Sequence, residues 1–245
     1  MMHDKISSGS HDFNKWLEGG YETDVITMIA GPPASGKTNL AVLAACSQAR
    51  QGRKVIFIDT EGGFSTERVK QITGEDSAKI LDNILLLQPT DFFEQRKAFN
   101  TLADKAKKEN TSLIVVDGMA MHYRLELGTV KNNESASVED IKKVNRALAW
   151  QMKTLAEISR KQKIPIIITN QVYSEFLSEE DRMKGVKPGT NIVGGDLMKY
   201  WSKSIIELKN DRGRRKAILL KHRSLPEKEI EFEIKNEGVF RRGWL

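Results

Sequence analysis

The sequence is poor in cysteine and in aromatic residues, and it lacks a long apolar run. Its 245 residues include one cysteine, Cys46, which excludes an intramolecular disulfide framework and a cysteine zinc site. We expect Cys46 to be a small, buried apolar residue. No stretch approaches the ~20 apolar residues that a membrane span requires, and the polar N-terminus shows no apolar signal-peptide segment. We therefore expect a cytoplasmic protein without a membrane partner.

Charge and histidine content give only weak signals. The 39 Lys and Arg residues against 33 Asp and Glu give a net charge of +6, which permits nucleic-acid binding but does not require it. The length is sufficient to bury a hydrophobic core, and we expect a single domain spanning residues 1–245. The histidines show no metal-ligand spacing, and they are His3, His11, His122 and His222.

Near-continuous apolar runs alternate with helical patterns along most of the chain. The helical patterns cover residues 39–50, 91–108 and 137–162. This alternation predicts an α/β fold with a mostly parallel, twisted sheet and helices on both faces. Short strand patterns near the C-terminus, joined in part by the turn signal at 210–213, predict an antiparallel extension. The predicted strands cover residues 25–30, 54–59, 84–88, 113–117, 164–169, 204–209, 217–222 and 229–234.

Residues 29–38 carry the clearest chemical signal. They contain the P-loop pattern G-x-x-x-x-G-K-[ST] between a predicted strand and a predicted helix, where backbone N–H groups and the helix N-terminus can bind phosphates. Lys37 would reach the β- and γ-phosphates, and the Thr38 hydroxyl would ligate Mg²⁺. The alternative is a Gly/Pro turn with a surface lysine. The predicted ATP-binding residues are Gly31, Pro32, Pro33, Ala34, Ser35, Gly36, Lys37, Thr38 and Asn39.

Polar residues follow three other predicted strands, at the edge where a ligand of an open α/β sheet binds. Asp117 ends one strand and would hold Mg²⁺, although a turn-forming or helix-capping aspartate is the alternative. Glu61 is the predicted residue that polarises the attacking water, with Asp59 as the reserve and an ordinary acidic loop as the alternative. Gln171 could hydrogen-bond the γ-phosphate and report its presence to the following loop.

Together these strand ends resemble the RecA-type ATPase core, and more narrowly its archaeal and eukaryotic recombinase branch. The segment at 6–20 resembles the lead-in of that branch to the P-loop, and 58–62 resembles the segment with its catalytic glutamate, which maps onto Glu61. The resemblance implies that Arg68 lies against the adenine and that Gln171 senses the γ-phosphate. The segments 194–196 and 225–227 resemble the end of the second DNA-binding loop and the ATP cap, which touches the nucleotide of a neighbouring subunit.

The chain also departs from a full recombinase. It starts almost at the ATPase core, so we expect the helical N-terminal DNA-binding domain and the Phe-x-x-Ala polymerisation motif to be absent. Tyr200 stands where eukaryotic relatives carry a phosphate-sensing histidine, and His222 and Arg223 stand near a cap without its usual acid. The second loop is acidic at Glu175, Glu179, Glu180 and Asp181. These departures resemble a core-only paralogue of the archaeal recombinase, and they imply slow hydrolysis.

The family resemblance places DNA at two loops, which we expect at residues 128–137 and 173–195. Tyr123 and Arg124 match an aromatic–arginine pair of the first loop, where tyrosine could stack on a base. The alternative is a packed tyrosine with a surface arginine. A basic hairpin could follow a phosphate backbone, or it could simply protect a sheet edge. Its residues are Lys209, Arg212, Arg214, Arg215 and Lys216.

These observations favour an ATP- and DNA-binding RecA-like protein that assists homologous recombination and repair with weak ATPase activity. The expected partners are DNA, bound without sequence preference, and a recombinase of the RecA/RadA type, while homo-oligomerisation stays open. An alternative function is a nucleotide-gated adaptor that acts through protein contacts with a recombinase. A KaiC-type signalling ATPase is a third hypothesis, and no sequence signal for a phosphorylatable site or for ring assembly supports it.

Overall fold

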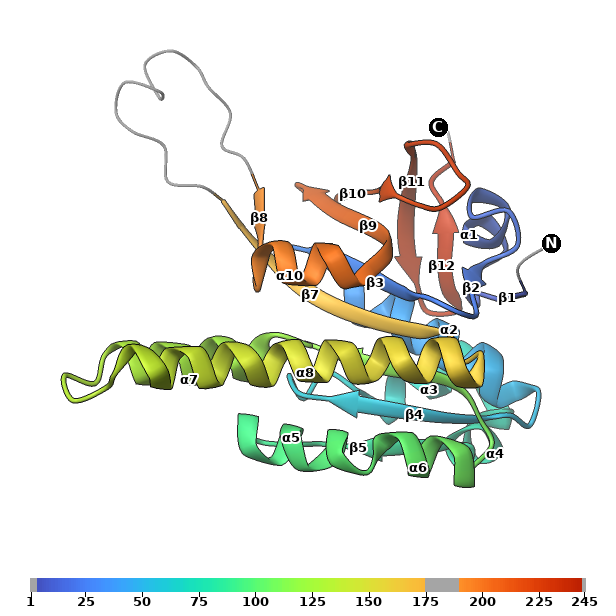
Figure 1. The fold of residues 1–245 in the computed structure, drawn as a ribbon. Coiled ribbons are helices and arrows are strands. Elements are labelled where there is room, and N and C mark those ends of the chain that lie inside the picture. The colour runs from blue at the N-terminus through green and yellow to red at the C-terminus, as the bar shows by residue number, and fades with distance from the viewer. Residues whose placement is uncertain (1–3, 175–189, 244–245) are drawn as a thin grey trace, which may run out of the picture.

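The computed structural model describes residues 4–174 and 190–243 around one large β-sheet (Figure 1). Its strands are β3 (Ile26–Gly31), β4 (Lys54–Asp59), β5 (Ile84–Leu87), β6 (Thr111–Asp117), β7 (Ile166–Ser174), β8 (Thr190–Ile192), β9 (Ser202–Asp211), β10 (Arg214–Lys221), β11 (Lys228–Lys235) and β12 (Gly238–Arg241). They lie in the order β12-β11-β10-β9-β3-β7-β6-β4-β5, with β8 paired to β7 outside this path. All neighbours from β9 to β5 are parallel, whereas β9 to β12 pair antiparallel.

Helices cover both faces of the sheet. Buried residues of α1, α2, α3 and α4 join one hydrophobic cluster, and those of α5, α6, α7, α8 and α10 join the other. Their bounds are α1 (His11–Trp16), α2 (Lys37–Arg50), α3 (Thr66–Thr73), α4 (Ser77–Leu81), α5 (Phe92–Asn100), α6 (Leu102–Lys108), α7 (Met121–Lys131), α8 (Val138–Gln162) and α10 (Gly195–Trp201), with a short 3₁₀ turn at Gly74–Asp76. A small separate sheet pairs β1 (Lys5–Ile6) with β2 (Tyr21–Glu22).

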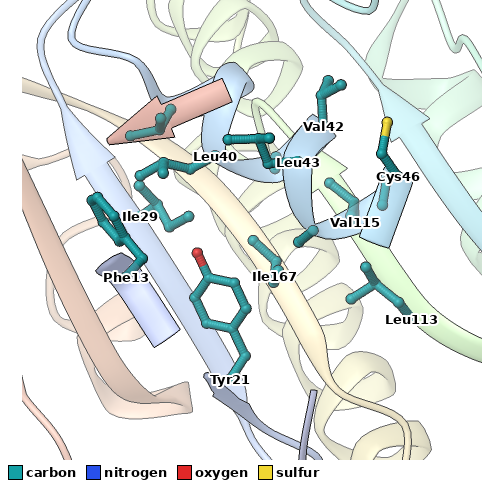
Figure 2. Packing of buried hydrophobic residues seen from close by; sticks show 14 of the residues in the cluster. Phe13, Tyr21, Ile29, Leu40, Val42, Leu43, Cys46, Leu113, Val115 and Ile167 are labelled. Carbon is teal, nitrogen blue, oxygen red and sulfur yellow. The ribbon is translucent and has the colours of Figure 1, made fainter. Parts of the chain in front are cut away.

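The strands are apolar on both sides because each side of the sheet is covered. Ile29 and Val115 point toward α2, whereas Met28 and Val116 belong to the opposite cluster, as the alternation of side chains along a strand requires. Figure 2 shows the first cluster, in which Cys46 lies among aliphatic side chains. Burial raises the pKa of the Cys46 thiol to about 11, so the prediction of a buried, apolar cysteine is confirmed.

The predicted fold class is confirmed, including the parallel core and the antiparallel C-terminal strands. The predicted turn joins β9 to β10, and Arg212 and Gly213 both have positive φ angles, 49° and 86°. Such a two-residue turn matches the right-handed twist of the paired strands. The sequence patterns missed β12, which is only four residues long and follows a second turn. No helix in the described parts of the chain is both long and apolar enough to span a bilayer.

The predicted loops need correction. The helix α7 extends to Lys131, so the first four residues of the expected loop at 128–137 are helical. This happens because Val130 and Leu127 pack against the same cluster as α8, which outweighs the low helix propensity of Gly128. Of the second expected loop, Tyr173 lies in β7 and 190–192 form β8. The acidic positions at 175 and 179–181 lie outside the described residues.

Phe13 anchors α1 to the C-terminal strands. It is fully buried and makes edge-to-face contacts with Trp16 and Phe232, at centroid distances of 5.5 and 5.4 Å. We expect Phe13→Ala to lower the free energy of unfolding by about 3–5 kcal/mol, because it removes a large side chain from a packed site. Urea denaturation followed by circular dichroism would measure this. Phe93→Ala is the matched control, since Phe93 is 60% exposed, and an equal loss in both variants would contradict the prediction.

Candidate nucleotide site

The P-loop connects β3 to α2 in a conformation that depends on small residues. Gly36 has φ +108°, and a Cβ there would lie 3.0 Å from Ile234 Cδ1. A Cβ on Gly31 would lie 2.6 Å from Ser35 Oγ and 2.9 Å from the Leu208 carbonyl oxygen. No side chain caps the N-terminus of α2, so its first N–H groups are available to an anion. The loop therefore has the close backbone approach that phosphate binding requires.

Lys37 folds back into this loop. Its Nζ donates to the carbonyl oxygens of Gly31 and Pro32, both at 3.0 Å, and the residue is 6% exposed. Burial lowers the pKa of Lys37, and the nearby carboxylates of Glu61 and Asp117 act in the opposite direction. The ammonium group thus lies at the mouth of the P-loop, within the field of the two carboxylates.

Thr38 and Asp117 offer oxygen atoms to one point. Asp117 ends β6, and its Oδ1 accepts a hydrogen bond from Thr169 Oγ1 at 2.5 Å. Its Oδ2 is buried and meets no hydrogen-bond partner among the described residues. A Cβ placed on Gly63 would lie 3.4 Å from Thr38 Oγ1 and 3.6 Å from Asp117 Oδ2, so both atoms face the same space. Burial raises the pKa of Asp117. A hydroxyl and an unsatisfied carboxylate oxygen are ligands that suit Mg²⁺.

Glu61 and Gln171 meet beside this point. The Gln171 Nε2 donates to Glu61 Oε1 at 3.1 Å, although the residues are 110 positions apart in the chain. The contact arises because β6 pairs with both β4 and β7, so that Glu61, which follows β4, lies near Gln171 of β7 at the same edge of the sheet. Glu61 itself is exposed, as a group that must reach a ligand and water would be. The structure therefore brings together the predicted catalytic residue and the predicted phosphate sensor.

Asp59, the reserve candidate, has a different position. It is 2% exposed, and its two oxygen atoms accept hydrogen bonds from the backbone N–H groups of Gly63 and Phe64, at 3.1 and 3.0 Å. Both oxygen atoms hold the loop that carries Glu61. The geometry thus favours Glu61 as the residue that faces the ligand, with Asp59 orienting its loop.

The sequence patterns did not single out Thr60, Gly118 and Thr169, which connect the strand ends. Thr60 Oγ1 donates to the carbonyl oxygens of Asp117 and Gly118, at 3.0 and 2.8 Å. The Gly118 N–H in turn donates to Thr169 Oγ1 at 2.7 Å. The available signal was a hydroxyl residue at the end of two strands and a glycine directly after Asp117.

Arg68 links three segments at the far side of the P-loop helix. Its Nε donates to Asn39 Oδ1 at 2.7 Å, and its Nη1 donates to the Asn236 carbonyl oxygen at 2.9 Å. Burial lowers the pKa of Arg68. The guanidinium plane is thereby held in place between α2, α3 and the β11–β12 turn. Such a fixed plane can stack against an aromatic ring.

Comparison with known proteins identifies the family of this chain. The Rad51 family model matches residues 3–241. The chain belongs to the Rad51 family. It is 40% identical to the DNA repair and recombination protein RadB of Methanobrevibacter smithii, over 91% of this chain and 90% of that one. The RadB of Methanococcus maripaludis is 39% identical over 91% and 94%. A crystal structure of the RadB recombinase superposes with a TM-score of 0.73 at 32% identity, covering 96% of this chain and 98% of that one.

The predicted resemblance to an archaeal paralogue within this family is therefore confirmed, because these relatives carry the RadB name and match over nearly their whole length.

The segment 225–227, which resembles the ATP cap of the family, follows a cluster of charged residues. Arg223 donates to both oxygens of Asp24, at 2.6 and 3.1 Å, and to Glu22 at 3.2 Å. These bonds to Glu22 of β2 and to Asp24 hold the chain just before the segment that resembles the ATP cap.

The expected placement of Tyr123 and Arg124 in a mobile loop of this Rad51-family chain is wrong. Both lie in the first half of α7, and Tyr123 is 9% exposed. Its hydroxyl donates to Asn145 Oδ1 at 2.8 Å, and its ring packs edge-to-face on Phe92. The packed-tyrosine alternative therefore describes this structure. Arg124 is exposed and lines a small cavity together with Glu61 and Gln171.

The basic hairpin forms as predicted, but carboxylates accompany its cations. Lys209 Nζ lies 3.5 Å from Glu207 Oε2, and Lys216 Nζ lies 2.9 Å from Glu229 Oε1. Arg212 and Arg214 are exposed at the turn, whereas Arg215 is half-buried on the side of Phe232. The positive field of the hairpin is thus weaker than a count of its basic residues indicates.

Gly118 offers a test of the hydrogen-bonded strand ends. It has φ +85°, and a Cβ there would lie 2.4 Å from Thr60 Oγ1 and 2.6 Å from Glu61 Cγ. We expect Gly118→Ala to lower the free energy of unfolding by about 1–3 kcal/mol and to displace Glu61. Urea denaturation and a nucleotide turnover assay would measure both effects. Gly52→Ala is the control for backbone strain alone, because Gly52 has φ +74° and open space around it. Equal behaviour of the two variants would contradict the predicted clash.

Proposed function

We propose that this chain binds ATP with Mg²⁺ and DNA, assists homologous recombination and repair, and hydrolyses ATP slowly. The observation that carries the proposal is the convergence of Lys37, Thr38, Asp117, Glu61 and Gln171 at one edge of the sheet. We also propose that residues 1–245 act as one RecA-like core domain in the cytoplasm. The RadB names of the relatives support recombination as the process.

The proposed roles follow from the positions of the side chains. Backbone N–H groups of the P-loop and the start of α2 would bind the phosphates, and Lys37 would exchange its loop carbonyls for phosphate oxygens. Thr38 and the free Asp117 oxygen would hold Mg²⁺, which supplies neutralisation of phosphate charge when bound. Glu61 would orient and polarise the attacking water. Arg68 would offer its fixed plane to the adenine.

Gln171 would couple the nucleotide to the DNA-binding side. It lies in β7, which runs on to Tyr173 and pairs with β8. Bonding to the γ-phosphate would withdraw the Gln171 amide from Glu61 and shift the strand end that follows. Arg124 lines the same small cavity and would sense that shift from α7. DNA contact by Arg124 and by the exposed arginines of the hairpin remains part of this proposal.

We expect slow ATP hydrolysis that single-stranded DNA stimulates and that salt suppresses, because phosphate contacts by Lys and Arg release counterions. The measurement is phosphate release with and without DNA at two salt concentrations. Lys37→Ala serves as the blank, and Glu61→Gln should retain ATP while losing turnover by about a hundredfold or more. Hydrolysis as fast as that of an ordinary recombinase, or full activity in Glu61→Gln, would contradict the proposal.

A nucleotide-gated adaptor is the second candidate function. The burial of Tyr123 and the ion pairs of Lys209 and Lys216 favour it, because they reduce the surface available to DNA. In this case ATP would act as a switch, and the protein would work through contacts with a recombinase of the RecA/RadA type.

The adaptor hypothesis predicts that bound nucleotide changes the affinity of this chain for such a recombinase, even where its ATP turnover is negligible. Titration of the recombinase in ATP and in ADP, with Lys37→Ala beside the parent protein, measures this. We expect a difference of about tenfold between ATP and ADP that disappears in Lys37→Ala. The same affinity in all four conditions would rule out gating by nucleotide.

A further inference from the structure

A second cavity lies at the end of β3 opposite to the P-loop. Its volume is about 410 Å³, and its walls come from the start of β3, the end of α8 and the start of β9. The P-loop follows the other end of the same strand, so the length of β3 separates the two places. None of the residues proposed to bind ATP or DNA lines this cavity. Its polar walls include Asp24, Ser159, Arg160, Lys163, Lys203 and Arg223.

Cations outnumber acids around the cavity. Arg223 pairs with Asp24 on the cavity wall and also with Glu22, so this group supplies more negative than positive charge. The ion pairs among the described residues do not include Arg160, Lys163 or Lys203. The lining therefore holds four cations, Arg160, Lys163, Lys203 and Arg223, against one acid, Asp24.

The positive charge of Lys203 acts on a second lysine beside the cavity. Lys203 Nζ donates to the Tyr200 carbonyl oxygen at 2.8 Å. Burial lowers the pKa of Lys221, and the charge of Lys203 lowers it further. A phosphate bound at Lys203 would offset this repulsion between the two lysines.

We infer that this cavity binds a phosphate group through Arg160, Lys163 and Lys203. Phosphate matches the site because its several oxygen atoms accept hydrogen bonds from different directions, and both Lys and Arg bind it well. A volume of about 410 Å³ exceeds that of a bare ion and lies within the range of small-ligand pockets. The half-buried Trp201 adds an apolar wall on which the remainder of a phosphorylated ligand can lie. The phosphate can come from a small molecule or from a nucleic-acid chain.

The test compares two double variants with equal loss of charge. Arg160→Gln with Lys203→Gln removes two lining cations, whereas Lys153→Gln with Lys161→Gln removes two exposed lysines that pair with Glu157 on the same helix. All proteins carry Lys37→Ala, so that the P-loop contributes as little as possible. Calorimetric titration with inorganic phosphate, at constant ionic strength, should show binding weakened by about tenfold or more in the first variant. The control should remain within about twofold of the parent.

A second arm identifies the source of the phosphate. A short single-stranded oligonucleotide is titrated into the same proteins. Loss of affinity for inorganic phosphate supports a small ligand, and a loss confined to the oligonucleotide supports a nucleic-acid chain. Equal affinities in both double variants, or tighter binding of a polyglutamate peptide than of either phosphate source, would overturn the inference. A failure of ATP hydrolysis would leave this result unaffected, because the P-loop is already disabled.

The unfolding temperature gives a second test, because a variant with a folding defect would unfold at a lower temperature than the parent. Removing unpaired cations relieves repulsion, so Arg160→Gln with Lys203→Gln should unfold at a temperature equal to or above that of the parent without phosphate. Added phosphate should raise the unfolding temperature of the parent and the control but not of this variant. Lys163→Gln alone should give a smaller change in the same direction. Phosphate stabilisation that persists in every variant would contradict the site.

Discussion

The register of the parallel strands is the constraint on which the nucleotide site depends. Backbone pairing sets Asp59 of β4 opposite Asp117 of β6, and Gly31 of β3 opposite Gln171 of β7. The strands β3, β4 and β6 thereby end beside the middle of β7, and the polar residues of the four strands meet at that edge of the sheet. A slip by one residue would turn every one of these side chains to the other face of the sheet. The apolar alternation that separates the two hydrophobic clusters prevents such a slip, so packing remote from the site determines its geometry.

Much of this arrangement could be predicted because its signals are local in the sequence. The P-loop pattern, the apolar strands and the acids at their ends are each contiguous, and their order along the chain indicates the parallel sheet. The roles of Thr60, Gly118 and Thr169 could not be predicted in this way. A threonine at a strand end has many functions, and only the pairing of β6 with β4 and β7 shows that these residues hold each other.

The failures have the same physical origin. Tyr123 was expected in a loop because the family resemblance matched it to an aromatic–arginine pair of the first DNA-binding loop, yet it lies in α7, which packs on α8. Tertiary packing of this kind outweighs local propensity. The hairpin shows a related limit: its basic residues were visible in the sequence, whereas the acid that pairs with Lys216 of β10 is Glu229 of β11, on the neighbouring strand. Charge balance between strands depends on their pairing, which the linear sequence does not display.

The hydrogen bond between Gln171 and Glu61 connects the two proposed functions. On the proposed roles, the sensor amide occupies the catalytic carboxylate while no γ-phosphate is bound, so Glu61 becomes free to orient water only when Gln171 moves to the phosphate. ATP binding and activation of the attacking water would then both depend on the hydrogen bond between Gln171 and Glu61. On the same proposed roles, this exchange would act as a switch, because the movement of β7 would require ATP binding and would not require its hydrolysis. An ATPase of low turnover and a nucleotide-gated adaptor, the two functions proposed for this chain, would then be two uses of one mechanism.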